Sequence, residues 1–137
     1  NKSTKVFQAL RILVNNEISE LIIGLSKACN IISKNGVIAV VAFHSIEDRI
    51  CKFFFNEISS LRKVSRYLPI NNNSDVSFKS IKKKPIIPTK KEIDENPPSR
   101  SAKLRAVQRT GINKIDTNFI FEKFKYLLEL EKMSLKL

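Results

Sequence analysis

The chain has 137 residues, of which 42% are hydrophobic, so it is long enough for one domain with a modest core and too apolar for wholesale disorder. Its formal net charge of +12 favours a polyanionic partner, nucleic acid before a membrane surface, although a generally Lys-rich composition would give the same total. No apolar run reaches the roughly 18 residues of a membrane helix, and no secretory signal is visible, so we expect a cytoplasmic protein without a membrane partner.

Two helices are expected before the first strand. The first ends near Asn15-Asn16, which either breaks it or caps the second, and the second runs to about Ser33. Asn35-Gly36 then supplies the left-handed residue with which helices commonly end. The two cysteines, Cys29 and Cys51, lack metal-ligand spacing and lie in apolar helical patterns, which predicts buried free thiols and no metal site.

The stretch from Val37 to Asp48 organises the middle of the chain. Seven apolar residues, Val37–Phe43, predict a strand buried on both faces, as in a parallel sheet. Ser45 offers an N-cap, with Asp48 three residues on, for a helix from about Ile46 to Ser60. His44, the single histidine, and Ser45 therefore lie at the carboxyl end of a strand, where open α/β sheets bind ligands.

The next segment is more irregular. Leu61–Asp75 lacks periodicity and is expected to be a surface loop, and Phe78–Ile81 an edge strand. Thr89 with Glu92 is a second capping-box pattern, which predicts a short helix through Glu95.

Two elements are expected in the last third. Ser101–Arg109 alternates as a half-buried strand, with its basic side facing outward. Phe119–Leu135 is an amphipathic helix that docks either on the sheet or on a partner.

Basic charge is concentrated between Lys79 and Arg109. This stretch holds ten basic residues against three acidic ones, which accounts for more than half of the net charge. Such clustering favours a phosphate-binding surface, and a solvated Lys-rich loop is the alternative.

Several kinds of catalytic site are absent from the sequence. The three glycines form no phosphate-binding or dinucleotide loop. Ser45, His44 and Asp48 formally supply a hydrolase triad, but adjacent Ser and His side chains rarely face one another, and no glycines flank Ser45 as in a nucleophile elbow, so hydrolase chemistry is rejected.

Four motifs, in order along the chain, resemble the bacterial 16S rRNA (cytosine-N4)-methyltransferases of the MraW/RsmH type. They are Thr4–Ile12, Val14–Glu17, Phe43–Arg49 and Asn96–Arg105. The sequence departs from that family at Lys2-Ser3, where His-Pro-Ala is usual, and at Pro98, where Arg is usual.

The resemblance implies an α/β fold, namely the C-terminal part of a Rossmann-like methyltransferase sheet with a C-terminal helix. Residues 1–111 would form the C-terminal half of the methyltransferase domain and residues 112–137 a helical extension. The cofactor of such enzymes is S-adenosylmethionine, whose Gly-rich loop lies in the half that precedes this region. The chain would then be a fragment, inactive alone, that binds RNA weakly.

The implied reaction is methylation of the N4 amine of a cytidine in 16S rRNA of the small ribosomal subunit. Its implied catalytic residues are His44, Ser45, Glu47 and Asp48, because hydrogen-bond acceptors would favour the nucleophilic form of that amine. The alternatives are that His44 bonds nearby backbone and that the two acids interact with the helix dipole. The implied RNA contacts are Arg49, Arg100, Ser101, Lys103 and Arg105.

Two other functions remain open. A non-catalytic basic α/β module could bind rRNA without methylating it. An interaction protein could form a homodimer through Phe119–Leu135.

Overall fold

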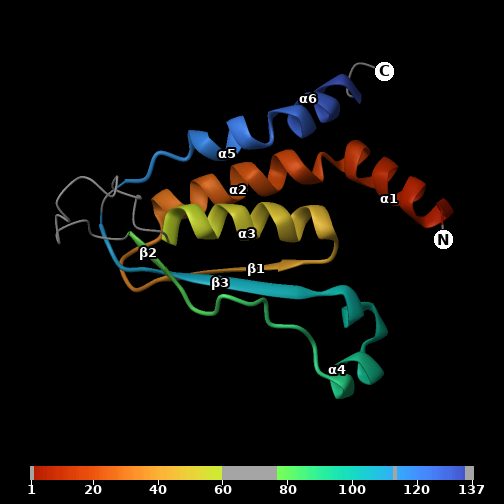
Figure 1. Cartoon of the computed structure of the whole chain (residues 1–137), viewed down its shortest axis with the longest axis horizontal. Helices are drawn as coiled ribbons and strands as arrows, with labels where there is room; N and C mark the ends of the chain where they lie inside the picture. The colour runs from red at the N-terminus through yellow and green to blue at the C-terminus, as the bar shows by residue number, and fades with distance from the viewer. Residues whose placement is uncertain (1, 60–76, 113, 135–137) are drawn as a thin grey trace, which may run out of the picture. The chain divides into compact units, whose positions relative to one another are not determined.

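The computed structural model describes residues 2–59, 77–112 and 114–134, so the expected loop at Leu61–Asp75 lies outside the described residues (Figure 1). The chain divides into two compact units. One is Ala28–Ile115, and the other combines Asn1–Lys27 with Asp116–Leu137. Within the described part of the chain, every helix is too short or too polar to cross a membrane.

A three-stranded sheet forms the centre of the Ala28–Ile115 unit. Its strands are β1 (Val37–Ala42), β2 (Phe78–Ser80) and β3 (Lys103–Arg109), in the order β1-β3-β2. β3 is antiparallel to both neighbours, so β1 and β2 run in the same direction with β3 reversed between them. The strand predicted at Val37–Phe43 is therefore observed at Val37–Ala42, one residue shorter, and its ladder in the described residues is antiparallel.

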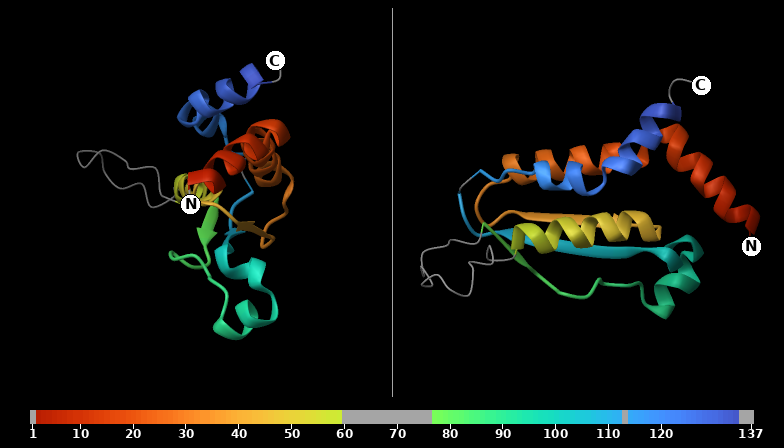
Figure 2. Two further views of the ribbon diagram at one scale, coloured as in Figure 1. Left: turned by 90° about the vertical axis from the view of Figure 1, so that its right-hand side faces the viewer. Right: turned by 45° about the horizontal axis from the view of Figure 1, so that its top comes forward.

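Helix α3 (Ser45–Ser59) connects β1 to the region of β2 and lies along one face of the sheet (Figures 1 and 2). Its buried residues follow helical spacing: Ile50, Cys51, Phe54, Phe55 and Ile58. They share the core with Ile38 and Ala42 of β1 and with Phe78 and Val107. These residues form the packing side of the helix.

The other face of β1 is open in this unit, which corrects the prediction of a strand covered on both faces. Exposure alternates along the strand: Ile38 and Ala42 are buried, whereas Val37 and Val41 are each 49% exposed. Successive side chains of a strand point to opposite faces, and α3 covers only one of them.

The prediction of a basic outer face on β3 is wrong. Arg105 pairs with Val40, and Val107 with Ile38, so the basic side of β3 shares the face that α3 covers. Leu104 and Ala106 lie on the opposite face. Sequence alternation identified the two faces correctly but not which of them is covered.

Arg109 lies on the covered face of β3 and is only 4% exposed. Its guanidinium donates hydrogen bonds to the carbonyls of Cys29 and Ile32, near the end of helix α2 (Glu17–Ile31), and to that of Gly111. It also lies 5.6 Å from the centroid of the Phe78 ring. The carbonyls of Cys29 and Ile32 lie where a helix end leaves acceptors without helical partners, so the buried cation is compensated.

The turn before β1 uses Asn35 rather than Gly36 as its left-handed residue, with φ 68°. Gly36 is required for a different reason. A Cβ at this position would lie 2.5 Å from Cγ1 of Ile32, so only glycine lets the turn approach the helix end.

Helix α4 (Lys90–Glu95) confirms the second capping-box prediction. Thr89 Oγ1 accepts a hydrogen bond from the Glu92 N–H at 3.2 Å. The 3₁₀ helix η1 (Pro97–Ser101) follows and leads into β3.

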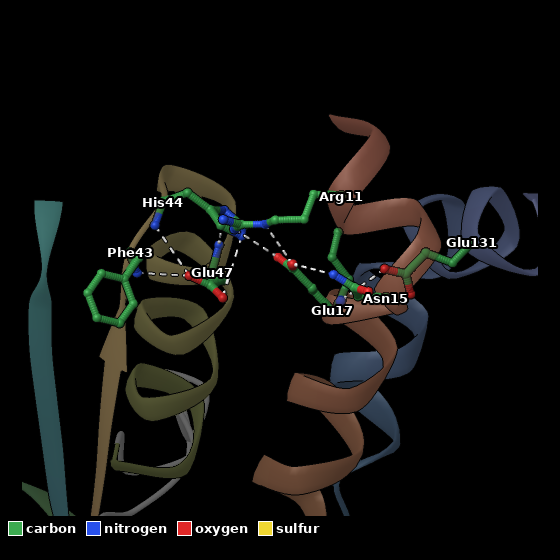
Figure 3. A network of polar contacts seen from close by, with 8 residues as sticks. Arg11, Asn15, Glu17, Phe43, His44, Glu47 and Glu131 are labelled. Carbon is green, nitrogen blue, oxygen red and sulfur yellow. Dashed lines mark hydrogen bonds and ion pairs between the residues drawn. The ribbon is translucent and has the colours of Figure 1, made fainter. Parts of the chain in front are cut away.

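The second unit is helical. It contains α1 (Lys2–Asn15), most of α2, α5 (Asn118–Lys123) and α6 (Lys125–Ser134). Asn16, with φ 52°, separates α1 from α2, and Arg11 forms an ion pair with Glu17 at 2.8 Å across this junction (Figure 3).

The C-terminal segment is two helices rather than the single expected one, because the chain leaves helical geometry at Phe124. Glu131 of α6 is only 1% exposed. Its carboxylate accepts hydrogen bonds from the Ile18 and Ser19 N–H groups at 2.9 and 2.8 Å, at the start of α2. The tail therefore supplies the anion that the N-terminus of α2 favours.

Candidate functional site

The candidate site is the corner between β1 and α3, where Phe43 and His44 follow the last strand residue. His44 is the N-cap of α3: its carbonyl accepts the Asp48 N–H at 3.1 Å, and its Nδ1 accepts the Glu47 N–H at 3.3 Å. In return, the Glu47 carboxylate accepts the N–H groups of Phe43 and His44 at 2.8 and 3.3 Å (Figure 3). This is a reciprocal capping box in which an imidazole replaces the usual hydroxyl.

The box lies one residue earlier than the Ser45 and Asp48 pair that the sequence predicted. A ring nitrogen two bonds from Cβ can reach the third N–H of the helix as a hydroxyl does, which places the cap at His44. The expected spacing of three residues is kept, but the partners are His44 and Glu47. Ser45 becomes the first residue of the helix.

This cap fixes the His44 ring, whose side chain is only 4% exposed. Because Nδ1 accepts a backbone hydrogen bond, the proton of the neutral ring is on Nε2, which lies 3.5 Å from Oε1 of Glu47. The ring is thus held against the backbone of its own corner.

The exposed groups at this corner are Phe43, which is 53% exposed, and Ser45. Phe43 continues the alternation of Val37 and Val41 on the open face of the sheet. Sequence reasoning included Phe43 in the apolar strand and so missed it. Its position directly before the single histidine was the available signal.

Asp48 ties the first turn of α3 to β3. Its carboxylate accepts hydrogen bonds from Arg105 Nε at 2.7 Å and from Lys103 Nζ at 3.2 Å. Burial by itself would raise the pKa of Asp48, but the hydrogen bonds and charges of Arg105 and Lys103 outweigh it and hold the pKa below its ordinary value. Asp48 is therefore a poor proton acceptor and a good brace.

The five residues that the resemblance implied as RNA contacts are placed differently from one another. Arg49, Arg100 and Ser101 are exposed, the last two in η1. The Lys103 side chain is 42% exposed, although it contacts Asp48. The Arg105 side chain is only 11% exposed and its Nε is bonded to Asp48.

The two thiols are buried and free, as predicted. Burial raises the pKa of Cys29 and of Cys51 to about 12 each, with Arg109 partly opposing the rise for Cys29. Neither thiol is ionised near neutral pH.

The described residues of this corner include no glycine-rich loop of the kind that binds S-adenosylmethionine. The N–H groups of Phe43 and His44 are already bonded to Glu47. Of the three glycines, Gly24 lies within α2 and Gly36 before β1, and Gly111 follows β3 at the opposite edge of the sheet, because β3 is antiparallel to β1. We assign no residue of this chain to that cofactor.

The unit is of the mixed α/β class, with a reversed strand between two strands of common direction and a polar corner after β1. The family match assigns it to the α/β fold of S-adenosylmethionine-dependent methyltransferases. Residues 1–110 match the model of the MraW methylase family. The chain belongs to that family, and all four motifs of the resemblance fall within the matched residues.

Curated relatives share this region. The chain is 47% identical over 110 residues to "Ribosomal RNA small subunit methyltransferase H" of Methylorubrum extorquens strain PA1, an alignment that covers 79% of this chain and 31% of the relative. Proteins of the same name from Oceanobacillus iheyensis and Persephonella marina are 44% and 45% identical, over 86% and 78% of this chain and 36% and 32% of their own lengths. The chain therefore spans about a third of the length of the curated relatives it matches.

Proposed function

We propose that this chain is the C-terminal part of a methyltransferase that transfers a methyl group from S-adenosylmethionine to the N4 amine of a cytidine in 16S rRNA of the small ribosomal subunit. The observation that carries the proposal is the family match over residues 1–110, which includes the whole corner at the carboxyl end of β1. The cofactor supplies the methyl group, and we assign its binding site to residues outside this chain.

In that reaction the chain fixes the conformation of the corner between β1 and α3, which faces the substrate. His44 and Glu47 satisfy the backbone of the first helical turn, and Asp48 fastens that turn to Arg105. We therefore assign His44, Glu47 and Asp48 as positioning residues. Preorganised geometry of this kind lowers the cost of orienting a reacting group.

The groups left to contact the substrate are Phe43 and Ser45. An exposed aromatic ring at a strand end suits stacking on a nucleobase, which is typical of the recognition of unpaired bases. The Ser45 hydroxyl can accept a hydrogen bond from an exocyclic amine. Arg49, Arg100, Ser101 and Lys103 are the RNA contacts, whereas Arg105 acts through Asp48.

RNA binding without catalysis is the expected behaviour of this chain alone, because its sequence holds no Gly-rich cofactor loop. Titration with S-adenosylmethionine should give no heat at micromolar concentration, while a labelled rRNA fragment should bind in low salt. Cofactor binding by the chain alone would contradict the assignment of that site to other residues.

The reaction is tested in a chimera in which residues 1–110 replace the matching region of the Methylorubrum extorquens relative. Incubation with unmethylated 16S rRNA and cofactor carrying a labelled methyl group should label the RNA. A folded chimera that binds the cofactor but leaves the RNA unlabelled would overturn the proposal, provided that the parent protein labels it.

A further inference from the structure

A shallow basic hollow lies between α3 and the segment that follows β2, away from the corner. Its lining includes Lys52 and Asn56 of α3, Ser80 of β2, and Lys82 and Lys83. Figure 1 shows the segment that leaves β2 running along the edge of the sheet beside β3. None of these residues belongs to the site described above.

Three lysines, Lys52, Lys82 and Lys83, carry the net positive charge of this hollow. Lys52, Lys82 and Lys83 are exposed, and among the described residues no ion pair joins any of them to an acid. Arg105 also lines the hollow, and its charge is balanced by Asp48. By contrast, Lys91 of α4 lies 3.8 Å from Glu95, and α4 carries three acids beside its two lysines.

Backbone contacts hold the segment that follows β2 against the sheet. Ser80 Oγ donates a hydrogen bond to the Lys82 carbonyl at 2.9 Å, and the Ile81 N–H donates to the Ala106 carbonyl at 3.1 Å. The backbone at Lys82 is therefore fixed, although its side chain is exposed. A fixed backbone reduces the conformational entropy that is lost when lysines bind a phosphate.

A stripe of exposed polar residues joins the hollow to the corner. Arg49, Lys52 and Asn56 are spaced three and four residues apart, so they share one face of α3. From Arg49 to Asn56 the helix rises about 10 Å. The stripe begins at Arg49, one turn after Ser45, and its other two residues line the hollow together with Lys82 and Lys83.

We propose that this hollow binds the sugar-phosphate backbone of the substrate RNA, one or two phosphates along the strand from the base at the Phe43 corner, through Lys52, Lys82 and Lys83. The inference rests on the proposed function, which supplies RNA as the polyanion. It adds a second contact region that the four motifs of the family resemblance do not contain. Lysines at such a site bind as point charges, so binding is independent of sequence and sensitive to salt.

The test is the affinity of the 137-residue chain for a short fluorescein-labelled single-stranded RNA, measured by anisotropy across a salt series. Each lost phosphate contact should reduce the slope of log K against log salt by about 0.7, or about 5-fold in affinity near 0.1 M salt. Lys82→Gln with Lys83→Gln should therefore weaken binding by about 25-fold. Lys82→Arg with Lys83→Arg should keep it.

The matched control is Lys90→Gln with Lys91→Gln on α4, which removes the same charge from exposed residues of the same unit. The control should change affinity by less than about 3-fold, because the attraction of net charge alone is diffuse and screened. An equal loss of RNA affinity in the two glutamine double variants, or an equal loss in the arginine double variant, would contradict the assignment of the hollow as a phosphate-binding site. It would leave the proposal that the chain binds RNA intact. No RNA binding by the unaltered chain would overturn both the hollow and the proposed RNA contacts.

Discussion

Arg105 and Asp48 are 57 residues apart in the chain and are joined by a hydrogen bond of 2.7 Å between Nε and a carboxylate oxygen. Their side chains are 11% and 15% exposed, so the pair is mostly shielded from water. It fastens the first turn of α3 to the middle of the sheet, and Lys103 adds a second cation to the same carboxylate. The corner that carries Phe43 is thus braced by tertiary contacts as well as by its helix cap.

Asp48→Asn should destabilise the chain by about 2 kcal/mol, because it leaves Arg105 mostly buried without a counter-charge. Glu95→Gln is the matched control. It breaks a pair whose side chains are 85% and 67% exposed and should cost less than about 0.5 kcal/mol. Urea unfolding followed by circular dichroism measures both, and equal costs would contradict the brace.

The contribution of Asp48 should also depend on pH. Its pKa in the folded chain is below the ordinary value of 3.8, so its stabilisation is present above that value and is lost as the pH falls through the folded pKa. The difference in unfolding free energy between Asp48→Asn and the unaltered chain should therefore be full near about pH 7 and shrink below about pH 4. A difference in unfolding free energy that stays constant down to about pH 2.5 would show that folding does not lower the pKa of Asp48.

His44→Ala should cost about 1–2 kcal/mol by removing the acceptor for the Glu47 N–H. His44→Asn should recover part of that loss, since asparagine is among the best N-cap residues. Thermal unfolding of the two variants is the measurement. Equal melting temperatures for both would mean that His44 stabilises the corner by packing alone.

Glu131→Gln should weaken the attachment of α6 to the start of α2, because an amide has one acceptor oxygen where the carboxylate uses two. We expect a loss of about 1–3 kcal/mol and faster hydrogen exchange at the Ile18 and Ser19 amides. Glu129→Gln, at an exposed position of the same helix, is the control. Unchanged exchange at both amides would contradict this contact.

Phe43→Leu in the chimera should lower kcat/KM for RNA methylation by roughly 10-fold or more, since stacking of an aromatic ring on a base contributes about 1–3 kcal/mol. Phe43→Tyr should retain the activity because it keeps the ring. The exposed position makes both variants compatible with folding. A leucine variant with full activity would remove Phe43 from the substrate site.

The sequence predicted the parts of the fold that depend on local pattern. Local spacing and capping residues were enough to predict three features: the strand within Val37–Phe43, the helix α3 and the Thr89 cap. The same holds for the burial of Cys29 and Cys51.

What the sequence did not reveal depends on partners far away in the chain. Alternation in β3 separates Arg105 and Arg109 from Leu104, but only α3 and the end of α2 decide that the basic side is covered. The open face of β1 likewise depends on what is present to cover it. The capping box was missed by one residue because imidazole is an unusual N-cap.

Nucleoside mass spectrometry of 16S rRNA treated with the chimera that carries residues 1–110 is the most direct test of the proposed methyl transfer. The predicted product is N4-methylcytidine, at the level produced by the parent Methylorubrum extorquens protein. Methylation at another atom, or none from a folded chimera that binds S-adenosylmethionine, would contradict it.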